Sequence, residues 1–303
     1  MKIRNIFFII FMTLLITTYS IFIWTNRQYK NNLRDFVRII KQELTEPKIK
    51  YKNRLPNLFE NFYKQFIFLL INESKTTPCL NKIKNFKILS NTKAEFHTLY
   101  NEIFMEKLYY FELNNETPFI IDCGSNIGMS ILFFKMLYPN SEIMGFEPSS
   151  NNFLLLESNI KNNNLKNIKI YKKALSNKIE TIKLYGTGTP LGSIIQDNPH
   201  NRANYENVKT DLLSNYIDKK VDLFKIDTEG AEALILDDLD INNKLYLIDK
   251  IIMEYHHFTT QNKLSELLSI LEKNKFAYQI CSDQHTPIEE RLAQHFFIYA
   301  YKK

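Results

Sequence analysis

The stretch from Phe119 to Gly128, FIIDCGSNIG, constrains the fold more than any other part of this sequence. Three apolar residues lead into Asp122, a turn bracketed by two glycines follows, and residues 129–138 are almost wholly apolar. This order is typical of a buried strand, a tight turn and a buried helix, which together open a parallel α/β sheet. Glycine lets a ligand approach the backbone, and the unpaired N–H groups of the next helix attract an anion. We therefore predict a nucleotide-like ligand with a carboxylate at this turn.

The spacing of the turn, D-x-G-x-N-x-G, differs from two common phosphate-binding loops. The dinucleotide fingerprint needs a glycine where Asn126 stands, and a P-loop needs a Gly-Lys-Ser/Thr that does not follow here. The next short strand ends in an acid, Glu147. In nucleotide-binding folds an acid roughly 20 residues further on binds the ribose hydroxyls. We expect S-adenosylmethionine as the ligand, held by Asp122, Gly124, Ser125, Asn126, Gly128 and Glu147.

Strand and helix patterns alternate from Phe119 onward, which indicates a mostly parallel sheet with helices on both faces. Further strands are expected at 167–171, 179–185, 221–226 and 249–255, and a closing antiparallel pair at 276–281 and 296–301. Ligands bind outside the carboxyl ends of the parallel strands in such sheets. The residues that directly follow those strands are therefore the candidates for the site.

Three acids lie within six residues directly after the expected strand at 221–226: Asp227, Glu229 and Glu232. Bringing them together is costly unless solvent, a proton or a cation relieves the repulsion. An acid is also favourable at a helix N-terminus because of the helix dipole, and we expect that role for Glu232. His256 and His257 directly follow the expected strand at 249–255, and successive residues of a strand point to opposite faces. At most one of the two histidines should therefore enter the site.

A hydroxyl is a weak nucleophile, and a positioned carboxylate or histidine can take its proton as a methyl group arrives. We predict that Asp227, Glu229 and His256 carry the catalytic step, with Asp227 or His256 as the base. A divalent cation held by these three residues and Glu254 is an alternative. Their spacing matches no known metal signature, so no metal site is predicted.

Four segments resemble the FkbM family of S-adenosylmethionine-dependent methyltransferases: IDCGSNIG at 121–128, GFEP at 145–148, ALS at 174–176 and FKIDTEGAE at 224–232. The resemblance covers about residues 120–254, and its last segment is the most specific. It implies a class I (Rossmann-like) fold with a mostly parallel seven-stranded sheet. It also implies an O-methyltransferase whose acceptor is a hydroxyl of a glycan, glycolipid or related small molecule. Ser176 is expected near the adenine, and Asn177 stands where the family usually carries aspartate.

The chain before residue 111 differs from the rest in charge. Residues 1–110 hold 18 Lys/Arg and 8 Asp/Glu, a balance of +10, whereas residues 111–303 hold 21 and 25, a balance of −4. Ile6 to Trp24 carries no charge, and as a helix its length of roughly 28 Å would match one hydrocarbon core. We therefore predict a transmembrane anchor over 1–26, a basic, mainly helical juxtamembrane segment over 27–110 and a methyltransferase domain over 111–303.

Flanking charges predict the orientation of this anchor. Lys2 and Arg4 precede the span and five Lys/Arg follow it within about 20 residues, so the positive-inside rule predicts a single-pass protein with a cytoplasmic catalytic domain. The three cysteines are far apart and form no disulfide framework, which agrees with a reducing compartment. The basic residues carry no recognition motif, so no nucleic-acid partner is predicted.

Two rival functions stay open at this point. One is a catalytically inactive protein that keeps the fold and binds S-adenosylmethionine, for example as a scaffold. The other is a nicotinamide-dependent oxidoreductase, which Asn126 disfavours because it replaces the fingerprint glycine.

Overall fold

The structure is a computed structural model that describes residues 78–185, 205–258, 263–282 and 293–302. The described residues all lie in one compact unit. The predicted anchor over 1–26 and the juxtamembrane segment up to residue 77 lie outside them. Across the described ranges, every helix is too short or too polar to cross a bilayer.

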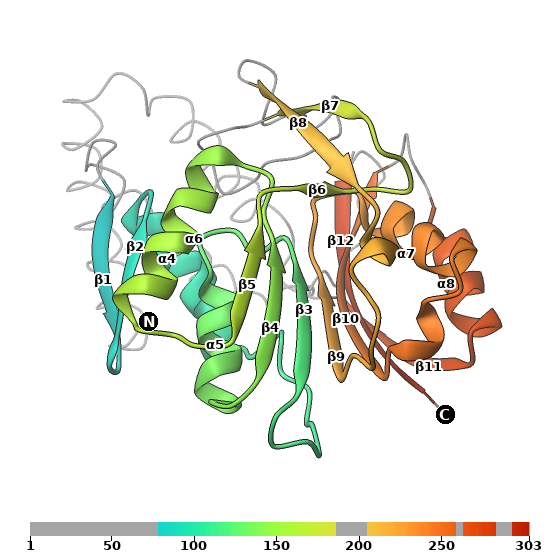
Figure 1. Ribbon diagram of the computed structural model, residues 1–303, viewed down its shortest axis with the longest axis horizontal. Coiled ribbons are helices and arrows are strands. Elements are labelled where there is room, and N and C mark those ends of the chain that lie inside the picture. The colour runs from blue at the N-terminus through green and yellow to red at the C-terminus, as the bar shows by residue number, and fades with distance from the viewer. Residues whose placement is uncertain (1–77, 186–204, 259–262, 283–292, 303) are drawn as a thin grey trace, which may run out of the picture. The chain divides into compact units, whose positions relative to one another are not determined.

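A seven-stranded sheet forms the centre of this unit, in the order β11-β12-β10-β9-β3-β4-β5 (Figure 1). Its strands are β3 (Phe119–Cys123), β4 (Glu142–Phe146), β5 (Ile168–Tyr171), β9 (Leu223–Ile226), β10 (Lys250–Phe258), β11 (Phe276–Cys281) and β12 (Ala293–Lys302). The strands from β10 to β5 pair in parallel, and β12 pairs antiparallel with both β10 and β11. The predicted mostly parallel seven-stranded sheet and its closing antiparallel pair are confirmed.

Helices cover both faces of this sheet (Figure 1). One face carries α4 (Lys93–Tyr100), α5 (Met129–Leu137) and α6 (Ser150–Asn162), and the other carries α7 (Glu232–Ile241) and α8 (Leu264–Lys273). Successive residues of β3 feed opposite cores, since Ile120 packs with the α5 side and Ile121 with the α7 side. This double cover explains why the central strands are apolar along their whole length.

Residues 79–90 form a hairpin, so the prediction of a mainly helical segment up to residue 110 is wrong for this part. Its strands are β1 (Cys79–Ile83) and β2 (Phe86–Ser90), and Lys84 in the turn has a φ of 51°. Asn159 of α6 fixes β2 in place: its Oδ1 accepts from the N–H of Leu89 at 2.7 Å, and its Nδ2 donates to the Leu89 carbonyl at 2.9 Å. The strand thus depends on a partner 70 residues away, which no local pattern indicates.

Smaller elements complete the description. The π-helix η2 (Asn101–Met105) continues α4, and short 3-10 turns occur at η3 (Leu213–Asn215) and η4 (Leu245–Leu247). A second sheet of order β6-β8-β7 contains β6 (Ala174–Leu175), β7 (Thr181–Tyr185) and β8 (Tyr205–Asp211). Glu206 of β8 accepts from the N–H and Oγ of Ser150, at 2.9 and 2.6 Å, which ties this small sheet to the start of α6.

Candidate active site

The turn from Cys123 to Gly128, here called the β3 turn, folds back onto β4. The N–H groups of Gly124 and Ser125 both donate to the carbonyl of Phe146, at 3.0 and 2.9 Å. Gly124 has a φ of +79°, and a Cβ built on it would lie 1.7 Å from the backbone oxygen of Asp227. The sequence suggested that this glycine gives a ligand room to approach. In the structure the close neighbour of Gly124 is instead the backbone of Asp227.

Glu147 links the β3 turn to the end of β4. Its carboxylate accepts from the N–H of Asn126 at 2.9 Å and from the N–H of Ser149 at 2.8 Å. Burial raises the pKa of Glu147 to about 7, although these two N–H groups act in the opposite direction. The carboxylate that is predicted to bind the ribose thus accepts a hydrogen bond from the backbone of the β3 turn.

Asn126 is the residue of this turn that best fits a bound ligand. It adopts a left-handed conformation with a φ of 49°. Its side-chain Oδ1 is buried and has no hydrogen-bond partner within the described ranges. A buried acceptor of this kind is costly unless a donor satisfies it, and a polar ligand can supply that donor. Gly128, with a φ of 91°, then starts α5.

Asp122 is fully buried, and both oxygens of its carboxylate contact side chains of the protein itself. The Oγ of Ser130 donates to its Oδ2 at 2.6 Å, and its Oδ1 lies 3.1 Å from the Nζ of Lys225. Lys225 is only 1% exposed and also donates to the carbonyl of Gly124 at 2.7 Å. The structure thus shows Asp122 as the partner of Lys225. A direct contact between Asp122 and S-adenosylmethionine stays a prediction.

Lys225 is a site residue that the sequence interpretation missed. Burial lowers its pKa, but the carboxylates of Asp122 and Asp227 act against burial and leave the pKa raised overall. The available signal was a lone cation inside the apolar strand β9. Its partners come from other strands, so their identity could not be predicted from the local pattern.

Asp227 directly follows β9 and rests on the β3 turn. Its N–H donates to the carbonyl of Cys123 at 3.0 Å. Its Oδ2 accepts from the hydroxyl of Tyr109 at 2.8 Å and lies 3.7 Å from the Nζ of Lys225. The Tyr109 ring centroid is 5.0 Å from the same Nζ, within range of a cation–π contact. The predicted catalytic carboxylate is thus held by two side chains.

His256 on β10 faces three carboxylates. Its Nδ1 lies 3.2 Å from Glu232 Oε1, and its Nε2 lies 3.4 Å from Glu229 Oε2 and 3.9 Å from Glu254 Oε1. Burial lowers the pKa of His256, but these carboxylates outweigh it and raise the pKa well above 6.5. His257 contacts an aromatic ring of β12. The prediction that at most one of the two histidines enters the site is consistent with this arrangement.

The acids around His256 are themselves strongly perturbed. Burial raises the pKa of Glu229 to about 7 and that of Glu254 well above 4.5. Glu232 starts α7 as expected, because its Oε1 accepts from the N–H groups of Thr228 and Gly230, at 3.1 and 2.9 Å. It is nevertheless buried, so it belongs to the site as well as to the helix start. We call Asp227, Glu229, Glu232, Glu254 and His256 the β9–β10 cluster.

The structure brings the three predicted catalytic residues together. Asp227, Glu229 and His256 each offer one possible ligand atom, and these atoms lie within 4.8 Å of one another. Ser176 lies instead beside the small sheet, where its N–H donates to the carbonyl of Asp211 at 3.1 Å. Its proximity to an adenine stays a prediction.

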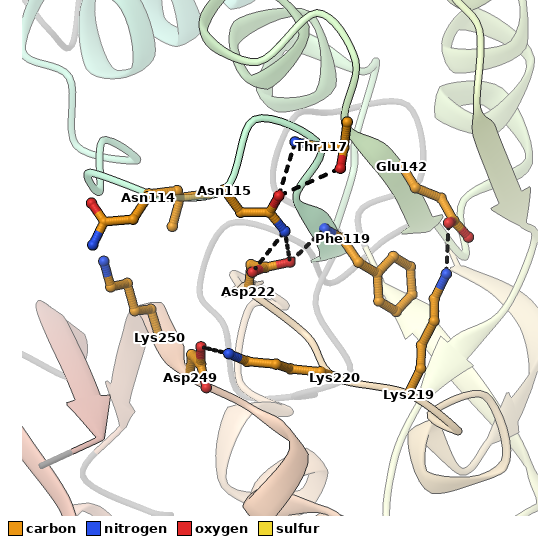
Figure 2. A pocket seen from close by; sticks show the side chains of 11 residues that line it. Asn114, Asn115, Thr117, Phe119, Glu142, Lys219, Lys220, Asp222, Asp249 and Lys250 are labelled. Atoms are coloured by element: carbon orange, nitrogen blue, oxygen red, sulfur yellow. Dashed lines mark hydrogen bonds and ion pairs between the residues drawn. The ribbon is translucent and has the colours of Figure 1, made fainter.

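A groove of about 710 Å³ lies at the opposite edge of the sheet, at the amino ends of β3, β4 and β10 (Figure 2). Its charged side chains include two ion pairs, Lys219 with Glu142 and Lys220 with Asp249, each at 2.6 Å. Open parallel sheets bind their ligands at the carboxyl ends of the strands, so the β3 turn and the β9–β10 cluster remain the candidate site.

Comparisons with known proteins identify the family of this chain. The family model of the methyltransferase FkbM domain matches residues 122–280, more than half of the chain. Methyltransferase 1 of Beauveria bassiana is 28% identical over 221 residues, which cover 65% of this chain and 88% of that protein. Methyltransferase sdnD of Sordaria araneosa is 27% identical over 198 residues, which cover 54% of this chain and 76% of that protein.

Solved structures show more distant similarity. Methyltransferase FkbM from Methylobacillus flagellatus aligns with a TM-score of 0.44 and 17% identity over 67% of this chain. The alignment spans 48% of that protein, about half its length. M. jannaschii TYW2 in complex with AdoMet aligns with a TM-score of 0.41 and 14% identity over 75% of this chain and 86% of that protein.

Proposed function

The chain belongs to the methyltransferase FkbM family of S-adenosylmethionine-dependent enzymes, and on this basis we propose that it methylates a hydroxyl oxygen of a glycan, glycolipid or related metabolite. The observation that carries the proposal is the convergence of Asp227, Glu229 and His256 beside the β3 turn. Transfer to a hydroxyl needs a donor site and a proton acceptor held in one fixed arrangement. The backbone bond from Asp227 to Cys123 joins these two parts.

Glu147 and Asn126 are the residues that we assign to the donor. The Glu147 carboxylate is an acceptor for the ribose hydroxyls, and the unpartnered Oδ1 of Asn126 is an acceptor for a second donor group. S-adenosylmethionine supplies an electrophilic methyl group on its sulfonium. Asp122 acts indirectly, because its carboxylate holds Lys225, which in turn bonds the carbonyl of Gly124.

Asp227 is the base that the geometry favours. Its side chain is 22% exposed, so an acceptor can reach it, whereas Asp122 is fully buried. Both ring nitrogens of His256 instead face carboxylates, Nδ1 that of Glu232 at 3.2 Å and Nε2 that of Glu229 at 3.4 Å, which makes His256 the second choice. As the O–CH₃ bond forms and the S–CH₃ bond breaks, the hydroxyl proton passes to the carboxylate and the donor leaves as an uncharged thioether.

The variant Asp227→Asn tests this assignment in the full chain. We expect calorimetric binding of S-adenosylmethionine to be unchanged, while transfer of an isotopically labelled methyl group into cell extracts is lost. Asp249→Asn is the matched control, because the same substitution at the opposite edge of the sheet removes only the pair with Lys220. Unchanged transfer in Asp227→Asn would reject the role of Asp227.

The same measurements separate the rival functions. Wild-type chain that binds S-adenosylmethionine without any transfer, over glycan, lipid and small-molecule fractions, would indicate an inactive binding protein. Binding of a nicotinamide cofactor in its place would indicate an oxidoreductase.

We also propose that Ile6 to Trp24 anchors the protein in a membrane with the catalytic domain in the cytoplasm. Support comes from the uncharged run and from the excess of Lys/Arg after it. Introducing Leu14→Lys and Leu15→Lys together should release the chain from the membrane fraction, whereas Leu14→Ile should not. A C-terminal tag that external protease digests in intact cells would contradict the orientation.

A further inference from the structure

The β9–β10 cluster combines the side-chain types that bind divalent cations. Asp227, Glu229 and His256 offer three ligand atoms within 4.8 Å of one another. Ligands on opposite sides of an ion with bonds of about 2.1 Å lie about 4.2 Å apart. Three atoms no more than 4.8 Å apart lie within about 2.8 Å of a common centre, so movements of roughly 0.7 Å or less bring each of them to this bond length.

His256 is oriented for this task by Glu232. Its Nδ1 faces Glu232 Oε1 at 3.2 Å, which leaves Nε2 turned toward Glu229 Oε2 at 3.4 Å. A carboxylate behind the ring is the usual support of a metal-binding histidine, because it fixes the ring and its tautomer.

Glu232 also gives an independent sign of a missing positive partner. It is only 1% exposed, and its Oε2 has no hydrogen-bond partner in the part of the chain that the structure describes. The other oxygen of the same carboxylate contacts His256. A buried carboxylate oxygen without a hydrogen-bond partner is costly, and the charge of a cation bound at the Nε2 of His256 lowers the cost of burying this carboxylate at the Nδ1.

We propose that Asp227, Glu229 and His256 bind one divalent cation of the first transition series, with Mn²⁺ as the first candidate. A set of two carboxylates and one imidazole favours such an ion over Ca²⁺ and Mg²⁺, which prefer oxygen ligands only. The role of the ion rests on the proposed methyl transfer: an acceptor hydroxyl coordinated to it has a lowered pKa and gives up its proton more readily. The binding itself does not depend on that function.

Metal titration of the full chain tests the site directly. After removal of metals with a chelator, MnCl₂ is titrated by calorimetry, and the loss of the free Mn²⁺ signal is followed by electron paramagnetic resonance. We expect one ion per chain and at least about tenfold weaker binding in Glu229→Gln and in His256→Gln. Mn²⁺ should also raise the Tm of wild type but not of Glu229→Gln, because a ligand that binds only the folded state stabilises it.

Glu142→Gln is the matched control, since it makes the same substitution in the groove at the opposite edge, where Glu142 pairs with Lys219. Binding in this control should equal that of wild type. Wild type that binds neither Mn²⁺ nor Zn²⁺ below about 1 mM would overturn the proposal. Binding that both cluster variants retain in full would overturn it equally.

A parallel titration with S-adenosylmethionine in the presence of chelator keeps the two proposals apart. Donor binding without any metal binding would overturn the cation site alone. Metal binding at the cluster in a chain that does not bind the donor would overturn the methyl transfer alone.

Discussion

Replacing Lys225 with methionine tests the contact that joins the two strand tips of the site. The Nζ of Lys225 lies 3.1 Å from Asp122 Oδ1, 3.7 Å from Asp227 Oδ2 and 2.7 Å from the carbonyl oxygen of Gly124. Methionine has a similar length but no charge. The substitution therefore leaves Asp122 as a fully buried carboxylate whose bond to Ser130 remains while its counter-charge is gone.

The expected cost follows from this burial. Removing one partner of a buried ion pair costs about 3–5 kcal/mol, because an uncompensated charge stays in a medium of low dielectric. At roughly 2–4 °C per kcal/mol for a domain of this size, the Tm should fall by about 6–20 °C. Removing the second charge as well, in Lys225→Met with Asp122→Asn, should recover part of the loss, with a coupling free energy of about 2 kcal/mol.

Urea unfolding followed by circular dichroism measures these free energies in wild type, both single variants and the double variant. Lys219→Met is the control, because Lys219 pairs with Glu142 at 2.6 Å but its side chain is 47% exposed. An exposed pair contributes about 1 kcal/mol or less. If Lys225→Met costs no more than this control, or if the double variant equals the sum of the singles, the buried pair does not hold the site together.

Three further predictions use the same unfolding assay. The pKa of Glu147 is raised from 4.5 to about 7, so its contribution to stability is fully present below pH 4.5 and is lost as the pH rises through 7, by up to about 3 kcal/mol. Glu147→Gln should reduce the slope between pH 4.5 and 7 but not abolish it, because the pKa of Glu229 is also raised to about 7; an unchanged slope would assign the effect to other groups. Gly124→Ala should cost several kcal/mol or prevent folding, because its Cβ would lie 1.7 Å from the Asp227 oxygen at a φ of +79°; full stability would contradict this contact. Tyr109→Phe removes the 2.8 Å bond to Asp227 and should cost roughly 1.5–3 kcal/mol, and a loss below about 0.5 kcal/mol would show that the bond contributes little.

Local sequence patterns were sufficient to predict the parallel sheet. Strands covered on both faces consist of continuous apolar residues, and every residue of β3 and β9 is buried. The expected strand at 276–281 coincides with β11. The expected strand at 221–226 starts two residues before β9 and ends at the same residue. Because parallel strands end at one edge, the acids after β9 and the histidine of β10 could also be placed together from the order of the strands alone.

Contacts between distant segments could not be predicted in this way. Tyr109 meets Asp227 across 118 residues, and Asn159 fixes β2 across 70. The sequence around Tyr109 and around Asn159 contains no pattern that identifies such a distant partner. The hairpin at 79–90 was therefore missed, and Tyr109 was not recognised as part of the site.

Gly124 and Lys225 together fix the position of the proposed base, Asp227, relative to the β3 turn. Because Gly124 lacks a side chain, the backbone of Asp227 can lie against it, and Lys225 then bonds the Gly124 carbonyl while facing the carboxylates of Asp122 and Asp227. The position of the proposed base is thus set by the same turn that holds Asn126 against Glu147, the residues assigned to the donor. A displacement of this turn must displace the Asp227 carboxylate as well. The backbone of Asp227 contacts the turn directly, and Lys225 contacts both the Gly124 carbonyl and the Asp227 carboxylate. Reaction geometry tolerates misplacements of less than about 1 Å, so the buried contacts of Lys225 matter to methyl transfer even though Lys225 does not touch the reacting atoms.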